Sequence, residues 1–175
     1  MKRPRGETRI SRFDAFKLCA GGATIAGEVD AALLPRLADR IAGGAGAAAV
    51  RWQIKGGHDF QSRPALTLSL EGLLPLICQR CLQPLFESVS HQTELLLARD
   101  EAELARLDAE EAEVVLAHSP LDAQTLVEDE LLLSLPFAPR HEEGACAARE
   151  VSGSTETTES PLAGLAVLKK QKTSD

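Results

Sequence analysis

The feature that most constrains the fold of this chain is a regular alternation of apolar and polar residues between Val50 and Leu97. The stretches VRWQIK, from Val50, and LTLSLE, from Leu66, place an apolar side chain at every second position. The intervening GGHDFQSRP has the composition of a turn. The extended pattern continues to Ile77, with a bulge expected at Gly72, and resumes from Leu85 to Leu97. This period of two predicts antiparallel strands with one buried face.

Shorter strands are indicated by TIAGEV, from Thr24, and by VVL, from Val114. With aromatic residues at only 3%, the core must be built from Leu, Val, Ile and Ala. We therefore predict an α+β fold in which two helices pack on an antiparallel sheet of about five or six strands, followed by a flexible C-terminal tail. A sheet of this size could curl toward a barrel.

Two helices are expected. Asp30 offers an N-cap for AALLPRLADRIA, residues 31–42, whose leucines recur at helical spacing although Pro35 interrupts the first turns. Asp122 offers a start for the second helix, which Leu135-Pro136 ends. One of the adjacent acidic residues at 128–130 is expected to be partly buried and paired, because apolar residues surround them. The polar run from Arg99 to Glu113 fits either a helix or a loop.

The chain divides into four segments by composition. Residues 1–9 form a basic N-terminus that we expect to be disordered, and residues 10–148 form a single domain. Residues 149–160 resemble a linker, and residues 161–175 form a short amphipathic C-terminal segment ending in lysines. Neither a membrane span nor a secretory signal is evident, so we expect a cytoplasmic protein.

The sequence ICQRCLQP brings two of the four cysteines three positions apart. In a reducing compartment such a pair favours metal binding or catalysis over a disulfide. Zinc takes four N or S ligands, so Cys78 and Cys81 require two more, which His141 and Cys146 can supply. Two alternatives stay open: a redox pair, which usually needs a helix after the cysteines, and reduced thiols packed as small apolar groups. Cys19 is expected in the core.

The formal net charge is −7, which argues against extensive phosphate binding. Eleven acidic residues lie between Arg99 and Glu130, whereas only Arg99 and Arg106 are basic there. The two ends of the chain are basic. An acidic middle could attract a basic protein, and the ends could contact RNA. The sequence has no GxxxxGK[ST], GxGxxG, HExxH or GxSxG motif, so an enzyme is not indicated.

Three stretches together resemble the bacterial YceD family, the large ribosomal RNA subunit accumulation proteins: CQRCLQPLFE, LDAQTLVEDELLLSLPFAPRHEEGAC and PLAGLAVLKK. The resemblance implies a role in the accumulation of 23S rRNA and in ribosome biogenesis. The motif residues of this chain are Cys78, Arg80, Cys81, Pro84, Phe86, Val127, Glu128, Asp129, Glu130, Pro136, Pro139, His141 and Cys146.

Charge and resemblance together favour a non-enzymatic acidic adaptor that holds a basic ribosomal protein or assembly factor during maturation of the large subunit. The alternative is a protein that binds rRNA directly, and the second alternative is a thiol redox enzyme or a nuclease. No membrane and no small-molecule substrate is inferred. The candidate contacts to a partner or to RNA are Arg80, Glu128, Asp129, Glu130, Lys169 and Lys170.

Overall fold

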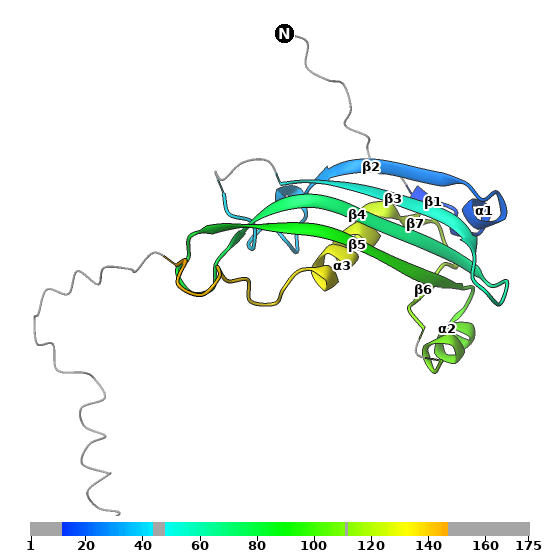
Figure 1. Ribbon diagram of the computed structural model, residues 1–175. Coiled ribbons are helices and arrows are strands. Elements are labelled where there is room, and N and C mark those ends of the chain that lie inside the picture. The colour runs from blue at the N-terminus through cyan, green and yellow to red at the C-terminus, as the bar shows by residue number, and fades with distance from the viewer. Residues whose placement is uncertain (1–11, 44–47, 111, 147–175) are drawn as a thin grey trace, which may run out of the picture.

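A five-stranded sheet is the centre of the computed structural model, which describes residues 12–43, 48–110 and 112–146 (Figure 1). Its strands lie in the order β2-β3-β4-β5-β6. Their bounds are β2 Thr24–Asp30, β3 Ala49–His58, β4 Pro64–Ile77, β5 Pro84–Ala98 and β6 Val114–Leu116. The predicted α+β class is confirmed, as are the strands expected from the alternating pattern.

The period-two pattern sets which residues the sheet buries. Trp52 pairs with Leu70 and Ile54 pairs with Leu68 across the β3–β4 ladder, and these side chains are buried. Arg51 pairs with Glu71 on the opposite, exposed face. The sheet therefore has one apolar face, against which the rest of the domain packs, and one polar face in solvent.

The sheet is curved but not closed into a barrel. In Figure 1 it arches over helix α3, with β2 at one margin. The ladders of β2 through β5 are antiparallel, whereas β6 joins β5 in parallel, after a crossover that contains α2. A second, two-stranded sheet pairs β1 (Arg12–Phe13) with β7 (Leu121–Asp122).

Three α-helices accompany the sheet among the described residues. Helix α3, Ala123–Ser134, begins after Asp122, which accepts a hydrogen bond from the Gln124 amide, as expected for its N-cap. Helix α2, Glu101–Asp108, lies within the polar run from Arg99 to Glu113, which the sequence left open between a helix and a loop. Helix α1, Ala15–Ala20, was not expected. None of these helices is long and apolar enough to cross a membrane.

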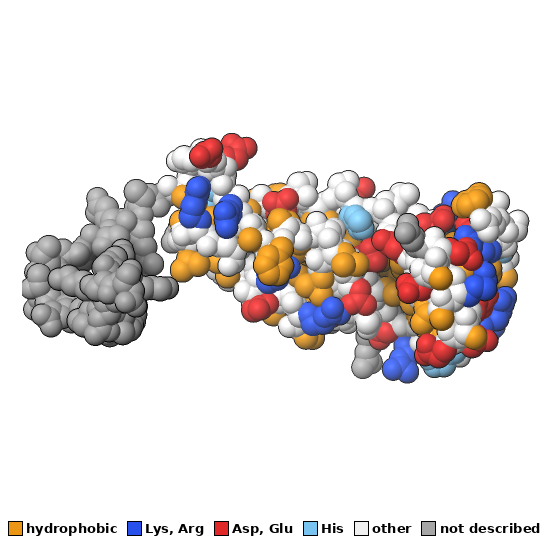
Figure 2. Space-filling model, turned by 90° about the horizontal axis from the view of Figure 1, so that it is seen from below, with side chains coloured by type: hydrophobic (Ala, Val, Ile, Leu, Met, Phe, Trp, Pro, Cys, Tyr) orange, Lys and Arg blue, Asp and Glu red, His pale blue; other side chains and the backbone are white. Residues whose placement is uncertain are grey.

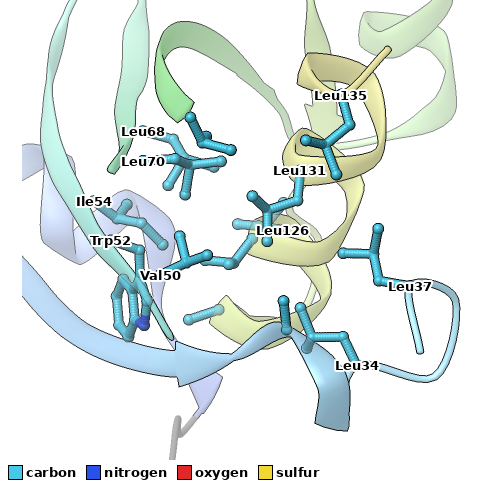
Figure 3. Close-up of a cluster of buried hydrophobic side chains, with 14 of the residues drawn as sticks. Leu34, Leu37, Val50, Trp52, Ile54, Leu68, Leu70, Leu126, Leu131 and Leu135 are labelled. Carbon is cyan, nitrogen blue, oxygen red and sulfur yellow. The ribbon is translucent and has the colours of Figure 1, made fainter. Parts of the chain in front are cut away.

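The prediction of a helix over residues 31–42 is wrong. Only a 3-10 turn, Ala31–Leu33, forms after Asp30. Leu34 is extended, with ψ at 120°, because the ring of Pro35 disfavours a helical conformation in the preceding residue. Leu34 and Leu37 are nevertheless fully buried, in the same core cluster as Leu126 and Leu131 of α3 (Figure 3). The apolar spacing therefore marked a core segment without a helix.

The prediction of a bulge at Gly72 is also wrong. Gly72 forms the terminal pair of the β3–β4 ladder, with Val50, and pairs with Val89 in a β4–β5 ladder that continues past it in both directions. A Cβ at this position would lie 2.9 Å from the Ala49 carbonyl oxygen, so glycine permits close approach of β3. The expected N-terminal segment 1–9, linker 149–160 and C-terminal segment 161–175 lie outside the described residues.

Candidate metal centre

The CQRC segment is the turn that joins β4 to β5. The Cys78 amide donates to the Gln83 carbonyl at 3.0 Å, which extends the β4–β5 ladder by one pair. The Leu82 amide donates to the Cys78 carbonyl at 2.9 Å, and Leu82 has a positive φ of 60°, which reverses the chain. The hairpin thereby places Cys78 and Cys81 at one end of the sheet.

The segment from Pro136 to Cys146 returns to this end of the sheet after α3. The Gln79 amide donates to the Pro139 carbonyl at 2.8 Å, which ties the segment to the hairpin turn. The Arg40 guanidinium donates to the Pro136 carbonyl and, at 3.4 Å, to that of Phe137. These contacts deliver His141 and Cys146 to the two hairpin cysteines, 60 and 68 positions away.

The four side chains expected to bind zinc form one cluster: their nearest ligand atoms all lie within 4.8 Å of one another. The Cys78 and Cys146 sulfurs are 3.7 Å apart. The His141 Nδ1 lies 3.4 Å from the Cys81 sulfur and 3.7 Å from the Cys146 sulfur. Ligands at zinc bond lengths in a tetrahedron would be separated by about 3.8 Å for two sulfurs and about 3.6 Å for sulfur and nitrogen. The cluster thus fits a tetrahedral Cys₃His site.

A hydrogen bond on the far side of the imidazole selects the nitrogen that faces the cluster. His141 Nε2 lies 3.0 Å from the Pro84 carbonyl oxygen, which can only accept. The neutral imidazole therefore carries its proton on Nε2, which leaves the Nδ1 lone pair for a metal among the three sulfurs. Metal-binding histidines are commonly oriented in this way by a backbone carbonyl.

Hydrogen bonds to the Cys78 and Cys146 sulfurs favour their ionised, metal-binding form. For Cys81, a hydrogen bond from the Gln83 backbone lowers the pKa, but burial and the neighbouring Cys78 and Cys146 sulfurs outweigh it, so that pKa rises. Burial raises the pKa of Cys78, but backbone N–H groups of Cys81, His141 and Arg80 outweigh it and lower that pKa to about 5. Burial likewise raises the pKa of Cys146, whereas Arg80 and His141 lower it, with a net decrease. Arg80 Nε donates to the Cys146 sulfur at 2.9 Å. Because three thiolates and Zn²⁺ carry a net charge of −1, this guanidinium would neutralise the site.

The acidic triplet of α3 lies away from this cluster and bonds within the chain. Glu128 and Glu130 are both buried, where one buried residue was expected. Glu128 accepts from the Arg36 amide at 2.6 Å, and Asp129 pairs with the Arg36 side chain. Glu130 lies 3.2 Å from His91 Nε2. Sequence reasoning missed the roles of Arg36 and His91, for which no motif gives a signal.

The remaining candidate contacts divide into two groups. Arg80 belongs to the cluster, because it also donates to the Glu142 carbonyl at 3.3 Å. Lys169 and Lys170 lie outside the described residues. Cys19 does not belong to the cluster: it is buried in the core, and its thiol donates to the Ala65 carbonyl at 3.1 Å, as expected for a core residue.

Comparison with known proteins gives one match. The family model described as large ribosomal RNA subunit accumulation protein YceD matches residues 66–169 of the 175 in the chain. Both halves of the Cys₃His cluster lie inside the matched region. Neither a curated protein nor a solved structure matches the chain.

Proposed function

Because the chain belongs to the YceD family of large ribosomal RNA subunit accumulation proteins, we propose that it is a non-enzymatic factor for accumulation of 23S rRNA and biogenesis of the large subunit. Within that role it acts as an acidic adaptor that holds a basic ribosomal protein or assembly factor in the cytoplasm. The observation that carries this proposal is the combination of the family match with a net charge of −7. A protein that coated rRNA would need excess positive charge to displace counterions.

Exposed carboxylates around α2 supply an electrostatic surface for such a partner. Figure 2, seen from below, shows acidic side chains at the end of the molecule where α2 lies, interspersed with basic ones. Arg99 and Arg106 form ion pairs with Glu103 and Glu110 of the same segment. Glu101 and Asp108 are exposed and form no ion pair within the described residues. Charge of one sign on such a surface speeds association with an oppositely charged partner.

The Cys₃His cluster serves this adaptor as a structural zinc site. Four protein ligands fill the tetrahedral coordination of zinc and leave no position for a water or substrate, as in structural rather than catalytic sites. When bound, zinc would supply bonds that fix the segment containing His141 and Cys146 to the β4–β5 hairpin. A thiol redox role has less support, because Cys81 is followed by a strand and not by the helix that usually activates such a thiol.

Affinity purification from cells, with and without nuclease, tests the adaptor directly. The expected result is a basic large-subunit protein that remains bound after nuclease treatment. The double variant Glu101→Lys/Asp108→Lys should weaken this binding, whereas Glu28→Lys, an exposed substitution on β2, should not. Loss of every partner on nuclease treatment, with RNA affinity that falls steeply with salt, would instead favour direct rRNA binding.

A further inference from the structure

Strand β5 has a long edge without a neighbour. On one side β5 pairs with β4 from Pro84 to Leu96, which is nearly its whole length. On the other side β6 pairs only with Leu96, Leu97 and Ala98 (Figure 1). The described residues therefore leave most of this edge unpaired, and an edge of this kind is a template for another strand.

Two hydrogen bonds identify the backbone groups that face this edge. The Leu96 amide donates to Glu113 beside β6, and the Pro84 carbonyl, at the other end, faces His141. Since backbone groups alternate between the two sides of a strand, the remaining even-numbered residues also face outward. Over residues 86–92, the open groups therefore belong to Phe86, Ser88, Ser90 and Gln92.

The edge lacks three of the features that usually prevent strand addition. Between residues 86 and 92 it has no proline, no lysine and, because the β4–β5 register is continuous, no bulge. Phe86, Ser88, Ser90 and Gln92 are exposed. The open stretch spans about 20 Å at about 3.4 Å per residue, which is the length of an ordinary strand.

The side chains below this edge carry negative charge. Glu87 is half-buried on the inner face of β5, and Glu113 contacts Thr93 on the same face. Glu130 is buried behind His91, so the carboxylates open to an added strand are Glu87 and Glu113. A recess of about 410 Å³ lies at the Pro84 end of the edge, where Phe86, Glu87 and Arg140 form part of its lining. An added strand would thus place alternate side chains against carboxylates. One end of that strand would lie at the recess beside the Phe86 ring.

We infer that the free edge of β5 binds an extended segment of a partner protein by strand addition, with Lys or Arg at alternate positions facing the inner carboxylates. The inference rests on the proposed adaptor function and specifies how the basic partner docks. Backbone hydrogen bonds to Phe86, Ser88, Ser90 and Gln92 would give affinity, and the alternating charge would give register. A second copy of this chain is a poorer occupant, because its net charge is also −7.

The test uses the full chain and a synthetic peptide of about nine residues in which Lys and Thr alternate. A peptide of the same composition with its lysines grouped controls for charge alone. Amide hydrogen exchange should show Ser88, Ser90 and Gln92 unprotected in the free protein and protected after the alternating peptide is added. Val89 and His91, whose amides bond to β4, should be protected throughout.

Ser90→Pro supplies the matching variant, because it removes an outward N–H and no bond to β4. We expect Ser90→Pro and Ser90→Lys each to weaken peptide binding about tenfold. Ser90→Ala should leave binding within about twofold of the wild type. An unchanged unfolding midpoint in Ser90→Lys keeps the test valid if the proline variant unfolds.

Three results would overturn the inference. They are equal binding of the grouped and alternating peptides, protection of the even-numbered amides before peptide is added, and wild-type peptide binding by both Ser90→Pro and Ser90→Lys. Protection before addition would indicate that the chain's own terminal segment or a second copy covers the edge. If both variants still retain a basic large-subunit protein from nuclease-treated cells, the adaptor survives and only strand addition fails.

Discussion

The Sγ atoms of Cys78 and Cys146 lie 3.7 Å apart although 68 positions separate the two residues in the chain. This contact joins the turn between β4 and β5 to the segment that follows α3. Because the closed loop contains β5, α2, β6, β7 and α3, a metal bound here would constrain about two fifths of the chain. The stability of the domain should therefore depend on the metal.

Removal of zinc should lower the free energy of unfolding. Ligand at a thousandfold excess over its dissociation constant stabilises a folded protein by about 4 kcal/mol. We expect a chelator to remove a stabilisation of this order in the wild type, measured by denaturant unfolding. Cys78→Ser should not respond to chelator, whereas Cys19→Ala, which loses a core thiol outside the cluster, should respond like the wild type. Equal stability of the wild type with zinc and with chelator would refute the dependence of folding stability on the metal.

Two adjacent glycines of β3 should respond differently to alanine. A Cβ on Gly56 would lie 2.4 Å from the Leu18 carbonyl carbon in α1, whereas a Cβ on Gly57 would meet nothing within 4 Å. Gly56→Ala should therefore destabilise the protein by about 1–3 kcal/mol or more, since backbone must move. Gly57→Ala should be neutral or slightly stabilising. Thermal unfolding of both variants checks this, and similar midpoints would show that α1 does not pack closely on β3.

Leu37 and Leu33 test the irregular segment that replaces the expected helix. Leu37 is fully buried, whereas Leu33 is 75% exposed. Leu37→Ala should cost about 2–5 kcal/mol of stability, as for other buried leucines. Leu33→Ala should stay within about 0.5 kcal/mol of the wild type. Comparable losses in chemical denaturation would place the two residues in similar surroundings and contradict the packing in Figure 3.

Glu130 should make stability depend on pH. Burial raises its pKa above the ordinary 4.5, the hydrogen bond from His91 opposes this rise, and the charge of Glu113 adds to it. The folded protein then binds the proton more tightly than the unfolded chain, so this group's contribution falls as pH increases from 4.5 through the raised pKa. Glu130→Gln cannot titrate, and its stability relative to wild type should increase across that window. A difference independent of pH would exclude this account.

The sequence predicted the strands well because a half-buried strand needs an apolar residue at every second position. Val50, Trp52 and Ile54 follow that period, and a helix or a loop would not require such alternation. Helical spacing is less specific, since Leu34 and Leu37 can be buried equally well by a chain that turns after Pro35. Helix α1 had one readable signal, the N-cap at Asp14, but six residues are too few for a periodic pattern.

The candidate site was predictable because few residue types bind zinc. Cys78, Cys81, His141 and Cys146 could be grouped by ligand chemistry before their positions were known. What surrounds them was not predictable. The contact from Arg80 to Cys146 and that from His141 to the Pro84 carbonyl depend on how the hairpin and the returning segment meet, and no local pattern encodes that meeting.

Zinc K-edge X-ray absorption of protein purified without chelator tests the central claim, a Cys₃His zinc centre, most directly. We predict one zinc per chain with three sulfur neighbours at about 2.3 Å and one nitrogen at about 2.0–2.1 Å. Cys146→Ser should replace one sulfur by a lighter atom or lose the metal. Protein that holds no stoichiometric zinc, or zinc surrounded mainly by oxygen and nitrogen, would contradict the account.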